Sequence, residues 1–166
     1  MSRRRFEDMD CSVAQTLDVV GDWWTLLVVR EATFGTRRFC DFERNLGIAK
    51  NILADRLRKL VDHEVLDREE APDGRVTYRL TERGRDLSTV LVALREWGDK
   101  WVYGRGNEPI VLVERESGRR VKGLALLGAD GQPIDGGRVV ARPGRHAPDS
   151  VRRRFRRRVA DSTRPV

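Results

Sequence analysis

The chain has few of the residues that build metal, disulfide or membrane sites. Its two cysteines, Cys11 and Cys40, cannot form a disulfide framework or a four-cysteine zinc site, so we expect no metal and no cofactor. No apolar run approaches the roughly 18 residues that a membrane-spanning helix needs, and the N-terminal residues have no apolar stretch suited to a secretory signal. We therefore expect a cytoplasmic protein without membrane contact.

The sequence also lacks the patterns of a catalytic site. It contains no nucleophile and base at a recognisable spacing, no paired carboxylates, no phosphate-binding loop and no metal cluster. These absences predict that the protein is not an enzyme.

Positive charge is abundant, but it is concentrated at one end of the chain. The net charge is +7 over 166 residues, and residues 138–166 alone hold ten Arg against two Asp, or +8. Phosphates attract Lys and Arg, so the excess indicates a nucleic-acid partner. Residues 1–137 carry a net charge of −1, however, so DNA binding by this part has to be inferred from where individual residues lie.

Apolar periodicity predicts four helices and then a hairpin. The expected helices cover residues 13–20, 23–33, 38–46 and 49–64. Gly47 separates the last two by only a short turn. Strands are expected over residues 65–70 and 76–80, because the Pro-Asp-Gly sequence between them is typical of a turn. Thr81 is the predicted N-cap of a final long helix that ends before Gly104.

These elements predict a mainly α (α+β) fold, a winged helix-turn-helix with a small β-rich C-terminal appendage and a basic tail. We expect residues 1–107 to form the winged helix-turn-helix domain. Residues 108–142 are expected to form the appendage, with short strands over 110–115, 121–127 and 138–142. Residues 143–166 contain too few apolar side chains to offset the entropy of ordering, so we expect this tail to be disordered when free.

A helix that follows a tight turn is presented outward, and its diameter matches the B-DNA major groove, about 12 Å wide. The predicted base-reading residues on the outer face of the fourth helix are Lys50, Asn51, Ala54, Asp55 and Arg58. Asn suits adenine edges, Lys and Arg suit guanine, and a small Ala suits a thymine methyl group. The predicted contacts to the DNA backbone are Arg37, Arg38, Lys59 and, at the hairpin tip, Arg75.

At these positions the sequence resembles the HxlR family of bacterial winged-helix regulators, which is related to the MarR group. The resemblance covers roughly residues 8 to 103. The motifs that carry it are Cys11, Gly21-Asp22-Trp23-Trp24-Thr25, Arg38-Phe39, Leu46-Gly47-Ile48, Leu53, Arg56-Leu57, Leu60, Tyr78-Arg79-Leu80-Thr81, Gly84 and Leu87.

The resemblance implies a homodimer that binds double-stranded DNA and regulates transcription, with the first and last helices packed between subunits. Two positions depart from the family pattern: Trp23 stands where Lys is usual, and Ala49 stands where a capping Ser is usual. The C-terminal stretch resembles a ribbon that carries cysteine knuckles in some relatives, but its turns here have no Cys or His.

Several features have two interpretations. Cys11 is either a redox or electrophile sensor or an ordinary half-buried thiol, whereas Cys40 is expected to be structural. Trp97 and Trp101, four residues apart, are expected to be buried in a core or interface, with a pocket for a small-molecule effector as the alternative. The basic tail either contacts phosphates or is a solvated end. The winged helix itself is either a sequence-specific DNA reader or a protein-interaction module with only nonspecific, tail-mediated nucleic-acid binding.

Overall fold

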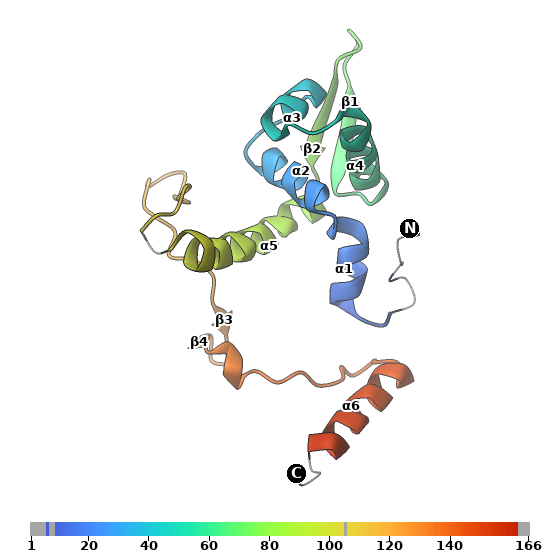
Figure 1. Ribbon diagram of the computed structural model, residues 1–166, viewed down its shortest axis with the longest axis vertical. Helices are drawn as coiled ribbons and strands as arrows, with labels where there is room; N and C mark the ends of the chain where they lie inside the picture. Colours follow the sequence, from blue (N-terminus) through green and yellow to red (C-terminus); the bar gives the residue numbers. More distant parts are fainter. Residues whose placement is uncertain (1–5, 7–8, 105, 163–166) are drawn as a thin grey trace. The chain divides into compact units, whose positions relative to one another are not determined.

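The computed structural model describes residues 6, 9–104 and 106–162, with side chains given as far as residue 156, and Figure 1 shows its helices and strands. The chain divides into two compact units. One unit is residues 19–124, and the other joins the described residues up to 18 with those from 125 onward. Within the described residues, no helix is both long enough and apolar enough to cross a membrane.

The unit of residues 19–124, called here the winged unit, contains the predicted helices and hairpin. After α1 (Ser12–Val20), which runs into this unit, its elements are α2 (Trp23–Thr33), α3 (Phe39–Leu46), α4 (Lys50–Asp62), β1 (Leu66–Glu70), β2 (Val76–Leu80), α5 (Glu82–Gly98) and the π-helical turn η1 (Asp99–Tyr103). The predicted fold class is confirmed. The predicted helix over residues 49–64 is slightly shorter in the structure, because Ala49 and His63 are its caps.

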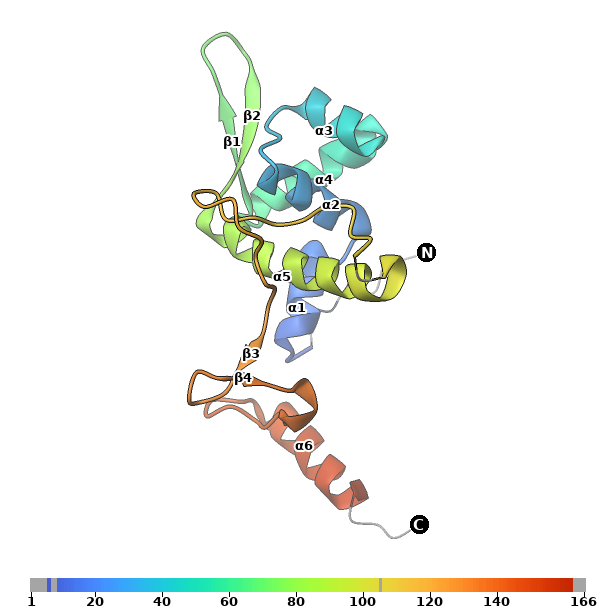
Figure 2. The ribbon, with the colours of Figure 1, turned by 90° about the vertical axis from the view of Figure 1, so that its left-hand side faces the viewer.

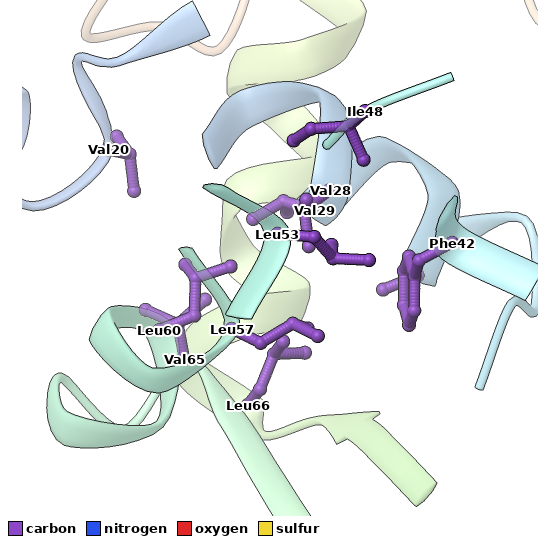
Figure 3. Packing of buried hydrophobic residues seen from close by; sticks show 11 residues of the cluster. Val20, Val28, Val29, Phe42, Ile48, Leu53, Leu57, Leu60, Val65 and Leu66 are labelled. Carbon is purple, nitrogen blue, oxygen red and sulfur yellow. The ribbon is translucent and has the colours of Figure 1, made fainter. Parts of the chain in front are cut away.

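The core of the winged unit is formed where α2, α3, α4 and the hairpin meet. Figure 3 shows Val28, Phe42, Leu53 and Leu57 packed together from three helices, and each is at most 1% exposed. The ring of Phe42 also meets Tyr78 of β2 edge to face, with centroids 6.4 Å apart. Leu53 and Leu57 recur at helical spacing on α4, where the sequence predicts an apolar stripe, whereas it predicts an α2 that is apolar nearly all round.

The hairpin is joined tightly to α5. β1 and β2 pair antiparallel, from Leu66 opposite Leu80 to Glu70 opposite Val76. At the base of the hairpin, the Thr81 hydroxyl donates to the Glu64 carbonyl (2.6 Å) and accepts the Gly84 N–H (3.0 Å), so Thr81 caps α5 as predicted.

Gly84 allows α5 to approach the chain that leads into β1. A Cβ atom added there would lie 2.1 Å from the Val65 carbonyl oxygen, far inside van der Waals contact. Figure 2 shows α5 leaving the hairpin and running alongside α2. The hairpin and the helical core are thereby fixed to one another.

The predicted strands beyond residue 107 are mostly wrong. Residues 110–124 contain only one isolated bridge, between Val113 and Arg120, and two hydrogen bonds tie this segment to α5: Arg95 Nη1 to the Ile110 carbonyl and the Leu124 N–H to Glu96 Oε1, both 2.9 Å. Many of its apolar side chains are exposed. An alternating pattern without a second layer to cover it does not support an independent sheet.

The other unit contains a two-stranded ribbon and a helix. β3 (Leu126–Leu127) pairs with β4 (Pro133–Ile134), and the short 3-10 turn η2 (Gly136–Arg138) occupies the start of the expected strand over 138–142. In place of the disorder expected of the tail, α6 (Asp149–Ser162) follows. The division between units falls inside the expected appendage, and the organisation into residues 1–107, 108–142 and 143–166 stays a prediction.

Candidate nucleic-acid interface

α3 and α4 are connected by a three-residue turn. Gly47 ends α3 in the left-handed conformation (φ 60°), and its N–H bonds the Glu43 carbonyl. Glycine is suited to this position because it has no Cβ. Ile48 is then buried in the core, and Ala49 begins α4 without a side-chain cap, as expected where Ser is missing.

The two faces of α4 differ completely in burial. Leu53, Leu57 and Leu60 are buried in the core. The five predicted base-reading residues are all exposed: Lys50, Asn51, Ala54, Asp55 and Arg58. We call these five residues the α4 face. The backbone candidate Lys59 is half-buried.

The cations of the α4 face lie beside carboxylates. Arg58 forms an ion pair and a hydrogen bond with Asp55 one turn earlier on the same helix. Lys50 Nζ lies 3.9 Å from Glu43 Oε1 of α3. The guanidinium of Arg58 is therefore held in place, and its charge is largely balanced within the helix.

The wing tip is organised by Asp73. Its carboxylate accepts the Arg75 N–H (3.1 Å) through Oδ1 and the Arg75 Nε–H (2.5 Å) through Oδ2. Gly74 has a positive φ of 78°, and its N–H closes the turn on the Ala71 carbonyl (2.8 Å). Arg75 is exposed at the end of the hairpin, as the sequence predicts for a backbone contact.

The two arginines before α3 differ in their surroundings. Arg37 is half-buried, its Nη1 donates to the Ala32 carbonyl (3.0 Å), and its own carbonyl accepts the Tyr78 N–H (2.8 Å). Arg37 thus connects the end of α2 to β2. Arg38 is exposed at the N-cap position of α3.

A buried polar cluster that sequence reasoning missed holds the loop between α2 and α3. Glu31 is 8% exposed, and its carboxylate accepts hydrogen bonds from Arg30 (2.9 Å), Asn45 Nδ2 (3.0 Å) and Thr36 Oγ1 (3.2 Å). Burial alone would raise the pKa of Glu31, but these hydrogen bonds outweigh it, so the pKa lies below its ordinary value. The available signal was a Glu on the same face of α2 as Val28 and Ala32.

The two cysteines lie in different settings. Cys11 is half-buried just before α1, where the N–H groups of Ala14 and Val13 lower the pKa of its thiol and Arg154 adds a smaller effect in the same direction. Arg3 to Arg5 and Asp8, which are close to Cys11 in the sequence, lie outside the described residues. Cys40 is exposed on α3, so its expected role as a buried structural thiol is wrong.

The tryptophans of the last helix are exposed in the single chain. Trp97 is 63% exposed and Trp101 is 65% exposed, so neither lies in the core of the single chain, and their burial in an interface stays a prediction. Trp23 is exposed as well. Further apolar side chains are exposed along the same part of the molecule: Val90, Leu94, Val102 and Tyr103. We call Val90, Leu94, Trp97, Trp101, Val102 and Tyr103 the α5 patch.

Comparison with known proteins agrees with this geometry. A model of the HxlR-like helix-turn-helix family matches residues 19–105. An HTH-type transcriptional regulator of Mycobacterium tuberculosis is 40% identical over 135 residues, which cover 80% of this chain and 85% of the relative.

Solved structures extend the similarity. PA1607, described as a candidate transcription factor, is 41% identical with a TM-score of 0.78, over 85% of this chain and all of that one. The redox regulator HypR in its oxidised form is 34% identical with a TM-score of 0.50, over 54% of this chain and 95% of that one. The chain therefore belongs to the HxlR-like helix-turn-helix family, whose members are transcriptional regulators with a DNA-binding domain and not enzymes.

Proposed function

We propose that this protein binds a specific site in double-stranded DNA as a homodimer, with α4 in the major groove. The observation that carries the proposal is the α4 face. Five polar or small side chains are exposed along α4, and the leucines opposite them fix the helix to the core. A rigid helix that projects a mixed set of donors and acceptors is what direct readout of bases requires.

Within the α4 face, Asn51 and Arg58 are the main readers. An Asn side chain can bond adenine through two atoms, and an Arg fork can do the same with guanine. The ion pair with Asp55 keeps the guanidinium of Arg58 oriented before DNA arrives, which lowers the entropy lost on binding. Asp55 itself can accept a hydrogen bond from cytosine.

Phosphate contacts set the register of α4 without reading sequence. We assign them to Arg38, Lys59 and, at the wing tip, Arg75. Arg37 was predicted as a fourth phosphate contact. Its hydrogen bonds to Ala32 and Tyr78 favour a positioning role instead, in which it holds the loop before α3 against β2.

Dimerisation is supported by the α5 patch. Two tryptophans and four other large apolar side chains exposed on one helix and its extension are costly in water, and such a patch is typical of a protein interface. Changing Leu94 to Glu should convert the dimer to a monomer in sedimentation velocity, whereas Leu127→Glu, which changes another exposed leucine outside the patch, should not. A wild-type monomer at micromolar concentration would contradict this part of the proposal.

Cys11 is proposed as the sensor of an oxidant or electrophile. A thiol with a lowered pKa is more often a thiolate near neutral pH, and the thiolate is the reactive form. HypR, whose fold this chain shares in part, is a redox regulator. Footprinting the genome with and without an electrophile, for the wild type and Cys11→Ser, tests this role; footprints that never change would remove it.

The same footprinting supplies the operator for the main test. Asn51→Ala and Arg58→Ala should each lose about 1 to 3 kcal/mol of binding, confined to one base position per half-site. Arg119→Ala is the matched control, because Arg119 is also an exposed Arg beside a carboxylate, Glu114, but lies far along the chain from α4. If both α4 variants weakened every duplex equally, the protein would instead be an interaction module with nonspecific DNA binding.

A further inference from the structure

α6 carries a dense set of arginines that the α4 proposal does not use. Arg153, Arg154 and Arg156 are exposed, and none of the ion pairs formed among the described residues includes them. Arg157 and Arg158 follow in the sequence, and the nearest acidic residues of α6 are Asp149 and Asp161. Like charges this close repel one another unless anions lie nearby.

Local contacts hold the start of α6 in spite of this repulsion. Arg152 Nε donates to the Ala147 carbonyl (3.0 Å) and its Nη2 donates to the Arg145 carbonyl (2.7 Å), which ties the helix to the chain before it. Phe155 is half-buried in a shallow hollow that Pro143 and Arg152 also line. One arginine and one aromatic thus anchor the helix, and Arg153, Arg154 and Arg156 remain exposed.

In the winged unit, several exposed arginines are paired with carboxylates. Arg58 lies against Asp55, Arg75 against Asp73, and Arg79 Nε against Glu69 Oε2 at 2.9 Å. A paired cation has to be released from its carboxylate before it can neutralise a phosphate. Arg153, Arg154 and Arg156 take part in no ion pair among the described residues, so they need no such release.

We propose that α6 is a second DNA-binding surface, which contacts the phosphates of double-stranded DNA without regard to sequence. The Arg fork matches two phosphate oxygens, and each neutralised phosphate releases a condensed counterion. This inference rests on the proposed function, because α4 defines double-stranded DNA as the partner. α6 supplies affinity that depends on salt, and α4 supplies the choice of site.

DNA suits α6 better than a lipid surface does. A helix that lies on a membrane buries a broad apolar face of large side chains. The large apolar residues of α6 are only Val151, Phe155 and Val159 in its sequence, and the two with described side chains, Val151 and Phe155, are already half-buried within their own unit. The charge of α6 is therefore its main means of binding.

The test uses the full chain and a duplex of mixed sequence without the operator. The variant Arg153→Gln with Arg154→Gln and Arg156→Gln removes three cations, and Gln supports helices nearly as well as Arg. Replacing the same three residues by Lys keeps the charge and is the matched control. Fluorescence anisotropy at increasing KCl gives the slope of log affinity against log salt.

The Gln variant should have a slope shallower by about 2.7 for each subunit whose α6 contacts DNA, because each lost phosphate contact removes about 0.9. Between about 50 and 200 mM salt it should therefore lose about 40-fold less affinity than the wild type for each such subunit. The Lys variant should keep the wild-type slope. Circular dichroism of both variants shows whether α6 remains helical.

An unchanged slope in the Gln variant would overturn the role of α6. So would a loss of binding to vesicles of phosphatidylserine and phosphatidylcholine with no change on the duplex, which would show that α6 is a membrane contact. Failure of the α4 proposal has a different signature, since operator preference would then be absent while the Gln variant still changed the slope. The two ideas can therefore fail separately.

Discussion

The α4 face and α6 both present arginines to solvent, but only α4 places an acidic partner beside its own. Arg58 is held by Asp55 within one turn of helix, whereas Arg153, Arg154 and Arg156 take part in none of the ion pairs formed among the described residues. An arginine whose charge is balanced by a carboxylate attracts DNA only weakly at a distance, but its oriented donors can distinguish bases on contact. A row of unbalanced cations attracts any polyanion and distinguishes poorly between sequences.

This difference explains how a nearly neutral domain and a strongly basic end can serve one function. Under the proposed function, the −1 charge of residues 1–137 limits nonspecific binding by α4, and the +8 of residues 138–166 supplies general affinity.

The largest expected effect is on the free energy of unfolding, which depends on how tightly the core of the winged unit and α6 are packed. Phe42→Ala should destabilise the protein by about 3 to 5 kcal/mol, because Phe42 is fully buried and packs against Tyr78. Phe155→Ala, the matched change in α6, should alter the main urea transition by less than about 1 kcal/mol, because Phe155 is only half-buried. If both variants lowered the free energy of unfolding equally, α6 would be packed as firmly as the core of the winged unit, and this comparison would be wrong.

Replacing Glu31 tests whether a buried charge of the winged unit is stabilised by the partners around it. Glu31→Gln should cost about 1 to 3 kcal/mol at neutral pH, because a neutral acceptor bonds Arg30, Asn45 and Thr36 less strongly. The pKa of Glu31 is lowered in the folded protein, so its contribution is complete above its unfolded value of about 4.3 and is lost as the pH falls through the folded value. Urea unfolding at several pH values should show the two proteins converging in acid, and a constant difference would contradict this account.

Removing the acidic partner should make α4 behave more like α6. Asp55→Ala leaves Arg58 unpaired, so nonspecific binding should become more salt-dependent by about 0.9 in slope. Stability should change by less than about 1 kcal/mol, as is usual for an exposed pair. Asp62→Ala, which makes the same charge change at the other end of α4, is the control. Anisotropy titrations in which both variants steepen equally would show that net charge, not pairing, controls α4.

The smallest effect is expected at Cys11. In a Cys40→Ser background, the rate of iodoacetamide alkylation against pH should have its midpoint below the ordinary thiol value of about 8.5, because N–H groups of α1 lower the pKa of Cys11. Adding Arg154→Gln should raise that midpoint slightly, since Arg154 is the lesser cause. A midpoint at or above the ordinary value would argue against Cys11 as a sensor.

The sequence predicts the elements that depend on local rules. Helical spacing identifies the buried leucines of α4, Gly47 marks the end of α3, and Pro-Asp-Gly marks the hairpin turn. The exposure of the α4 face follows directly from that spacing. Each of these features is set by residues a few positions apart.

Features that depend on distant or external partners were not predictable in this way. The carboxylate of Glu31 meets Asn45 from the next helix, a contact that exists only once α2 and α3 have packed. Trp97 has the spacing of a buried residue but is exposed, because no packing partner lies within the single chain and a second subunit is what we propose to cover it. α6 was expected to be disordered because its composition is polar, and the hydrogen bonds from Arg152 to the Ala147 and Arg145 carbonyls that help to hold it are specific to this fold.

The central claim is that α4 selects the site and α6 supplies affinity. Its most direct test is the ratio of operator affinity to random-duplex affinity at one salt concentration, measured for the wild type, Arg58→Ala and the triple Gln variant of α6. We predict that the ratio falls by about 10- to 100-fold in Arg58→Ala, as expected for losing one good base contact, and stays within about twofold of wild type in the α6 variant. A ratio that collapses in the α6 variant while surviving in Arg58→Ala would contradict the account.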